Sequence, residues 1–332
     1  VAVGGYALDA NTTASDNTAV GYASLTANTT GANNVAVGRG ALQVNTTGAS
    51  NVAVGYAALD ANTTASYNTA VGENALSANT TGEVNDAFGY YALNANTTGT
   101  YNVAVGSRAL MANTTASYNT AVGRDALKVS TTAQRNTAVG YNALTAATTG
   151  SDNVTMGYVA GAAITTGIEN TILGYYAGNA ITTTNYNTFV GSGAGQLNTA
   201  ADNVAVGARS LDANTTGTRN VAIGKSALGA NTTASSNTAL GYNSLILNTT
   251  GADNVAIGAL ALDANTTASN NTTVGSESMS STTTGTQNTA MGKASMGANT
   301  TGSYNVAYGA YSLDANTTAS DNTAIGYGAL SE

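Results

Sequence analysis

The sequence predicts an all-β protein, a parallel β-solenoid (β-roll) of about 20 coils with a 17-residue repeat, packed side by side as a trimer. Three observations lead to this fold class. An Asn recurs every 17 residues, a Gly follows it at a fixed place in each coil, and Val, Thr and Gly are frequent while a helical apolar stripe is missing. The single period therefore predicts one continuous solenoid over residues 1–332 rather than several domains.

Each coil follows one consensus, which we number from its Asn: N-[TV]-A-V-G-x-x-[AS]-L-x-A-N-T-T-[GA]-x-x. The period is kept from Asn17 to Asn322, apart from one step of 16 residues between Asn187 and Asn203. Seventeen residues are too few for a pair of helices and too many for one strand. We therefore expect two or three short strands per coil, joined by tight turns.

Alternation within the first strand separates its two faces. In Val52-Ala53-Val54-Gly55, the two Val side chains lie on one face and Ala53 lies on the other. We expect the Val side to face the interior, where Leu59 joins it.

Positions 1 and 5 are expected to form structural ladders. Stacked Asn amides can bond the coils above and below, and an invariant Gly indicates a turn or a close backbone that rejects a Cβ atom. The ladder residues of the first full coils are Asn17, Asn34, Asn51 and Asn68, and Gly21, Gly38, Gly55 and Gly72.

The Asn-Thr-Thr triplet at positions 12 to 14 has two interpretations. Each triplet is formally an acceptor for N-linked glycosylation, whereas an inward-facing Asn would form an internal ladder, the interpretation that we favour. The candidate glycosylation sites are Asn11, Asn28, Asn45, Asn62, Asn214 and Asn316.

Residues 153–202 contain three variant coils, in which a lost core side chain is expected to be matched by a gained one nearby. If the one-residue deletion of the third coil lies before Leu197, that residue also takes position 12. The replacements are Gly161, Gly178 and Gly195 at position 9, and Ile164 and Ile181 at position 12.

Small residues suggest self-association. Position 3 is Ala in 16 of 20 coils, and position 8 is always Ala or Ser. If these side chains point outward, they form a face that another chain can approach closely, with three-fold packing the simplest closed arrangement. The alternative is that they lie at cramped corners inside one coil.

Composition argues against several functions. The chain has neither Cys nor His, so we expect no metal site and no cofactor. Only 8% of residues are charged, with a net charge of −8 and no cluster of Lys and Arg, which argues against a nucleic-acid partner. No apolar run is long enough to span a membrane.

One pair of carboxylates offers an enzymatic alternative. Asp152 and Glu169 both occupy position 17 in adjacent coils, where their separation would suit a glycan hydrolase of the tailspike kind. The simpler interpretation is an exposed charged ladder flanked by Arg135 and Arg219, and we expect no enzyme. Tyrosines at position 6 are candidate surface contacts, for sugars among other partners: Tyr22, Tyr56, Tyr90 and Tyr141.

The phrases N-V-A-V-G and N-V-A-I-G, as at Asn220 and Asn254, resemble the head repeats of YadA-type trimeric autotransporter adhesins. N-T-A-V-G-Y-x-A-L and A-G-x-x-I-T-T-G resemble repeats of phage tail fibres and bacterial surface proteins. The resemblance implies a parallel β-roll that forms trimers, although the 17-residue coil is longer than the adhesin repeat.

We therefore expect a structural fibre segment, extracellular, at a cell surface or in a virion fibre. It would act as a spacer and attachment surface, self-associating and contacting a surface glycan or host receptor. The alternative architecture is a single-chain solenoid that polymerises end to end into a filament.

Overall fold

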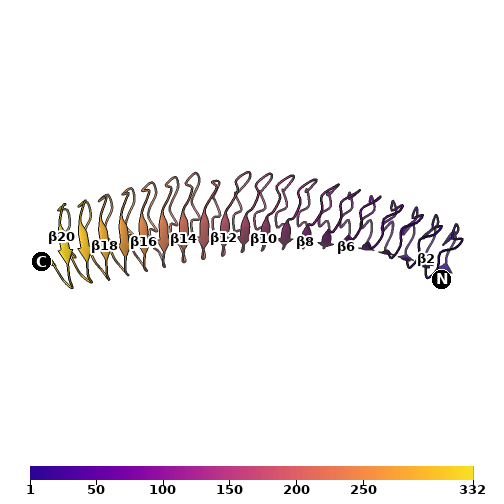
Figure 1. Cartoon of the computed structure of the whole chain (residues 1–332), viewed down its shortest axis with the longest axis horizontal. Coiled ribbons are helices and arrows are strands. Elements are labelled where there is room, and N and C mark those ends of the chain that lie inside the picture. Colours follow the sequence, from indigo (N-terminus) through magenta and orange to yellow (C-terminus); the bar gives the residue numbers. More distant parts are fainter. Residues whose placement is uncertain (332) are drawn as a thin grey trace. The chain divides into compact units, whose positions relative to one another are not determined.

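The structure is a computed structural model that describes residues 1–331, and each coil contributes one short parallel β-strand (Figure 1). The chain divides into two units, Val1–Glu169 and the part from Asn170 onward, which we describe separately. Within each unit the expected fold class is confirmed: both are all-β, parallel β-solenoids with one strand stacked on the next.

The strands of the first unit are β1 (Ala2–Val3), β2 (Thr18–Val20), β3 (Val35–Val37), β4 (Val52–Val54), β5 (Thr69–Val71), β6 (Asp86–Phe88), β7 (Val103–Val105), β8 (Thr120–Val122), β9 (Thr137–Val139) and β10 (Val154–Met156). The strands of the second unit are β11 (Thr171–Leu173), β12 (Thr188–Val190), β13 (Val204–Val206), β14 (Val221–Ile223), β15 (Thr238–Leu240), β16 (Val255–Ile257), β17 (Thr272–Val274), β18 (Thr289–Met291), β19 (Val306–Tyr308) and β20 (Thr323–Ile325).

Neighbouring strands pair in the register that the repeat dictates. Val52 lies opposite Val35, Ala53 opposite Ala36 and Val54 opposite Val37, so each repeat position stacks on its own kind. A one-residue slip would place every side chain on the wrong face. The shared period therefore fixes the register.

The expectation of two or three strands per coil is wrong, because left-handed residues interrupt the extended backbone. In the coil of β4, Ala57, Leu59 and Tyr67 have φ angles of 49°, 53° and 62°, a region that costs a non-glycine residue about 1–2 kcal/mol. These turns still bond along the stack: the Leu59 N–H donates to the carbonyl of Ala75 in the next coil over 3.0 Å. The coil is hydrogen-bonded to its neighbours well beyond its strand.

Gly at position 5 meets both conditions expected of it. Gly55 has a φ of +139°, and a Cβ atom built on it would lie 2.5 Å from the carbonyl oxygen of Gly72 in the next coil. The backbones therefore approach more closely at this turn than any side chain allows.

The inward face of the strand is the opposite of the one we expected. Ala53 is fully buried, as are Ala58 at position 8 and Leu59 at position 9, whereas Val52 and Val54 remain partly exposed. The reason is volume: a 17-residue coil encloses room for one Leu and small neighbours, but not for two further Val side chains. Leu59 lies inside, as predicted.

Two of the three variant coils replace the missing Leu from position 3. Ile172 and Phe189 are fully buried there, where 16 of the 20 coils have Ala. A Cβ atom on Gly178 would lie 2.8 Å from the Ile172 Cδ1 atom, and one on Gly195 would lie 2.5 Å from the Phe189 ring. The large side chains therefore occupy the space that a position 9 Leu fills elsewhere.

Position 12 of the variant coils is partly as expected. Ile164 and Ile181 are fully buried. Leu197 does not take this position, however: it is 55% exposed, and buried Asn198 takes the place instead, bonded to Asn214 of the next coil. The one-residue deletion therefore follows Asn198, because the chain keeps the Asn contact and shortens the loop beyond it.

Candidate functional site

Two ladders of buried Asn side chains run inside each unit. At position 1, the backbone N–H of Asn51 donates to the Asn34 Oδ1 atom over 2.9 Å, and its Nδ2 atom donates to the same oxygen over 3.2 Å. The Asn51 Nδ2 atom also donates to the carbonyl of Ala65, in its own coil, over 2.9 Å. Each amide thus forms hydrogen bonds in its own coil and in the preceding one. These bonds offset the cost of burying its polar atoms away from water.

The position 12 Asn side chains form the second ladder. Asn62 Nδ2 donates to Asn45 Oδ1 over 2.8 Å, and Asn45 Nδ2 donates to Asn28 Oδ1 over 2.9 Å. An N-linked glycan needs that same Nδ2 atom exposed to solvent, and at these positions it is buried.

The remaining candidate glycosylation sites differ in exposure. Asn214 is fully buried in the position 12 ladder of the second unit, whereas Asn11 and Asn316 are only partly buried. Even so, the Nδ2 atoms of Asn11 and Asn316 donate to the carbonyls of Ala14 and Ala319 over 3.1 and 3.0 Å. Glycosylation stays a prediction, and only the partly buried Asn11 and Asn316 are accessible enough for it.

The position 12 ladder of the first unit is interrupted after Asn113, because its last three coils carry Ser130, Ala147 and Ile164 at this position. Asn113 Oδ1 and Ser130 Oγ, in adjacent coils, are buried and lack a hydrogen-bond partner within the described chain. An Asn at position 130 would donate its Nδ2 atom to Asn113 Oδ1, but the shorter Ser130 side chain does not reach that oxygen.

The side chains of positions 2 and 4 form a continuous surface in each unit, which we call the outer sheet face. Position 4 is always apolar or Tyr, and position 2 is Val or Thr except at Asp86. Several position 4 side chains are strongly exposed, among them Phe88, Met156, Leu240 and Tyr308. The face is therefore regular and nearly uncharged, with an apolar row at position 4 beside a mixed row of Val and Thr at position 2.

This arrangement overturns the expected interaction face of small residues. Ala at position 3 and Ala or Ser at position 8 are buried inside single coils, as Ala53, Ala58 and Ser24 show. The alternative of cramped internal corners is confirmed. The side chains of positions 2 and 4, mostly Val and Thr, are at least partly exposed and can contact another chain.

Asp152, one of the two candidate catalytic carboxylates, is engaged by a cation. The Arg135 Nε and Nη2 atoms donate to its two carboxylate oxygens over 2.6 and 2.9 Å. This hydrogen-bonded guanidinium lowers the pKa of Asp152, as expected of the flanking charges in a surface ladder. Glu169 is exposed in the next coil.

A tighter charge cluster was not anticipated from the sequence. Asp125 is nearly buried and lies 2.7 Å from Arg108 Nη2, 3.3 Å from Arg124 Nε and 3.6 Å from Lys128 Nζ. The signal lay in the period, because Arg108 and Asp125 share repeat position 7 in adjacent coils. Such a pairing compensates the charge of a buried carboxylate.

The four candidate tyrosines at position 6 are all exposed: Tyr22, Tyr56, Tyr90 and Tyr141. Their rings contact other aromatic or cationic groups. Tyr141 stacks on a neighbouring Tyr158 ring at 5.2 Å between centroids, and Tyr22 lies 5.9 Å from the guanidinium carbon of Arg39.

Residues 1–331 include neither an apolar helix of membrane-spanning length nor a group of three His, Cys, Asp or Glu residues placed to hold a metal ion. Compared with known proteins, the sequence matches no family model, and no curated protein is detectably similar.

Proposed function

We propose that this chain is a structural segment of a fibre, extracellular or part of a virion, in which copies associate side by side through the outer sheet face. The proposal makes the protein a spacer and attachment surface and assigns it no catalytic role. Its support is the solenoid fold together with the resemblance to adhesin and tail-fibre repeats.

The observation that carries the proposal is the apolar row of the outer sheet face. A row of partly exposed apolar side chains that recurs in every coil is a typical protein–protein contact surface. A partner that covers one coil after another must repeat its own side chains at the same axial spacing as the coils. A second copy of the chain, aligned in parallel, meets that requirement at every coil.

Three copies around one axis form the arrangement that we propose. Each chain then turns its outer sheet face toward the axis, and the closed symmetry leaves no copy of the face uncovered. Val and Thr rows from facing sheets would interdigitate as in other packed sheets, at about 10 Å between backbones. The expectation of a trimer is thus kept, with a different set of residues at the interface.

Charges placed on the outer sheet face test this proposal. The variant Val54→Lys/Val71→Lys puts two ammonium groups on adjacent coils of the face, and we expect its mass in solution to fall from three chains to one. The matched control is Thr64→Lys/Thr81→Lys, on exposed loop positions of the same two coils, which should keep the mass of the unmodified protein.

Circular dichroism must show that all three proteins retain the β-solenoid. A folded outer-face variant with unchanged trimeric mass would contradict the proposed interface. Very large species that survive the outer-face substitutions would instead support end-to-end filament growth.

A further inference from the structure

Two surface hollows occupy equivalent places in the repeat, one in each unit. The first, of ≈ 170 Å³, is lined by Tyr22, Arg39, Gly40, Gln43 and Tyr56, and also by the carboxylate residue Asp60. The second, of ≈ 270 Å³, is lined by Tyr175, Tyr176, Ser192, Gly193, Gln196 and Arg209.

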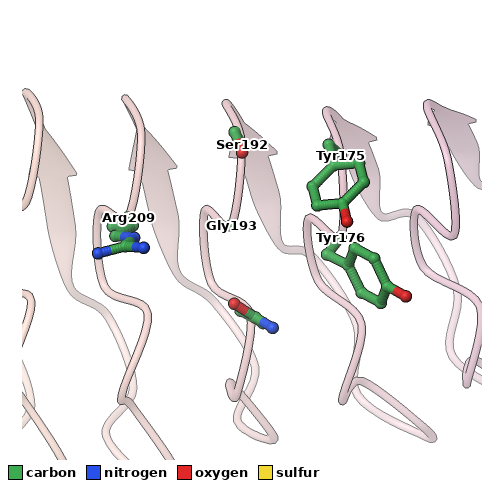
Figure 2. A pocket seen from close by; sticks show the side chains of 6 residues that line it. Tyr175, Tyr176, Ser192, Gly193 and Arg209 are labelled. Carbon is green, nitrogen blue, oxygen red and sulfur yellow. The ribbon is translucent and has the colours of Figure 1, made fainter.

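The hollows share their construction. In each, one coil supplies an exposed Tyr at position 6 and the next coil supplies Gly at position 7 and Gln at position 10. Figure 2 shows Tyr175 and Tyr176 on one coil, Gly193 on the next and Arg209 on the one after. The Gly opens the hollow, because every other coil except that of Gly328 carries a side chain at position 7.

The combination of Gly at position 7 with Gln at position 10 occurs in these two coils alone of the sequence. Gln stands at position 10 in two coils of the sequence, those of Gln43 and Gln196, and both have Gly at position 7. The next coil carries Asp60 or Asp212 at position 10, so the agreement extends across three coils. Each hollow also has an Arg, but in a different place: Arg39 is at position 6 of the coil that carries Gly40, whereas Arg209 is at position 7 of the coil after Gly193.

The chemistry of the hollows suits a sugar. An exposed Tyr ring offers a face to the C–H groups of a pyranose. The Gln amide both donates and accepts hydrogen bonds, as vicinal hydroxyls require, and a guanidinium binds a carboxylate through two parallel bonds. The volumes lie below the roughly 300–1,000 Å³ of sites for drug-sized molecules, as expected for one ring.

The guanidinium groups are available for such a ligand. Neither Arg39 nor Arg209 forms an ion pair within the described chain, unlike Arg108, Arg124 and Arg135. Arg39 lies 5.9 Å from the Tyr22 ring centroid and 6.0 Å from that of Tyr56, which holds it beside the hollow.

We propose that the two hollows are binding sites for a carboxylated pyranose, a uronic-acid unit of an acidic glycan. The site combines Tyr22 with Gln43 and Arg39 in the first unit, and Tyr175 with Gln196 and Arg209 in the second. It lies at repeat positions 6, 7 and 10 and is independent of the outer sheet face at positions 2 and 4.

Filling the hollows tests the proposal without breaking the fold. Asn occupies position 7 in other coils, as Asn74, Asn142 and Asn243, with φ angles of 53° to 55°. The variant Gly40→Asn/Gly193→Asn therefore places an accepted residue in each hollow. Ala294→Asn makes the same kind of change at a position 7 that lines neither hollow, and serves as the matched control.

The probe is a galacturonic acid oligosaccharide, titrated calorimetrically into the full chain, with the corresponding neutral galactose oligosaccharide in parallel. We expect two sites per chain, at least tenfold weaker binding of the double variant, and unchanged binding of the Ala294→Asn control. Each single Gly→Asn variant should lose one site.

Absence of uronate binding, or binding unchanged in the folded double variant, would overturn the proposal, as would equal affinity for the neutral sugar. The solution mass of the double variant should equal that of the unmodified protein. A failure of the glycan sites therefore leaves the self-association proposal untouched, and the reverse also holds.

Discussion

Asn51 and Asn62 donate to one and the same acceptor, the carbonyl oxygen of Ala65, over 2.9 and 3.0 Å. The two side chains belong to different ladders, so this oxygen joins both ladders within a single coil. Each amide also reaches the preceding coil, through Asn34 and Asn45. The interior is thus held by a polar network that fixes the loop after position 12 against the strand.

The interruption at Ser130 predicts a stabilising substitution. Ser130→Asn supplies a donor for the buried Asn113 Oδ1 atom and removes the unpartnered hydroxyl, at the expense of one new unpartnered oxygen facing Ala147. We expect the free energy of unfolding to rise by about 1 kcal/mol, the typical net value of a hydrogen bond.

The converse change, Asn62→Ser, should lower the free energy of unfolding by about 1–3 kcal/mol, because it leaves Asn45 Oδ1 buried without its donor. Urea unfolding monitored by circular dichroism measures both. A Ser130→Asn variant less stable than the unmodified protein would show that the interruption is not a defect of the ladder.

Gly55→Ala should be strongly destabilising. Its Cβ atom would lie 2.5 Å from the Gly72 carbonyl oxygen, at a φ of +139°, and strain of this kind costs about 1–3 kcal/mol from the backbone and a similar amount from the overlap. Gly40→Ala is the matched control, since the nearest atom to its Cβ would be Gln43 Oε1 at 3.4 Å. Similar unfolding midpoints for both variants would contradict the proposed close approach of the backbones.

The variant coils predict a coupled pair. Phe189→Ala should cost about 3–5 kcal/mol through the cavity it leaves, and Gly195→Leu alone should also destabilise because it overlaps the Phe189 ring. The double variant recreates the common pattern of Ala at position 3 and Leu at position 9. The double variant should lose much less unfolding free energy than the sum of the losses in the two single variants. Strict additivity in a double-mutant cycle would refute the compensation.

The free energy of unfolding should depend on pH through three half-buried aspartates at position 10. Burial raises the pKa of Asp60, Asp212 and Asp263 above the ordinary value of 3.8, and the hydrogen bonds from backbone N–H groups only partly oppose this. The folded state therefore binds protons more readily than the unfolded state. This preferential protonation stabilises the folded state fully below the ordinary pKa of 3.8, and the stabilisation is lost as the pH rises through the raised pKa of the folded state.

The triple variant Asp60→Asn/Asp212→Asn/Asp263→Asn removes this dependence. We expect it to have a higher thermal midpoint than the unmodified protein at pH 7, and the difference to shrink toward zero below about pH 4. A difference that is the same at both pH values would contradict the assignment to these carboxyl groups.

Much of the fold followed from the period, since a strict repeat dictates both stacking and register. The inward face did not, because alternation separates Val54 from Ala53 without saying which side is enclosed. Which side is enclosed depends on the cross-section of the coil. The cross-section is set by residues with left-handed backbone conformations, such as Leu59, and no local sequence pattern predicts these conformations.

The same limit applied to the sites. The Asn ladders were readable from the repeat itself. The contacts of Asp125 with Arg108, and of Gly195 with Phe189, arise between aligned positions or across the coil interior. An alignment of the coils by repeat position would have revealed both contacts. The hollow at Gly40 needed the volume of the structure as well, since an absent side chain carries no chemical pattern.

Light scattering after size-exclusion chromatography tests the central claim most directly. If the outer sheet face joins three chains, the mass will be close to three times the 32.6 kDa of one chain, and it will fall to a single chain when Val54 and Val71 are both replaced by Lys. A mass of one chain for the unmodified protein, at concentrations where the β-solenoid is folded, would contradict side-by-side association.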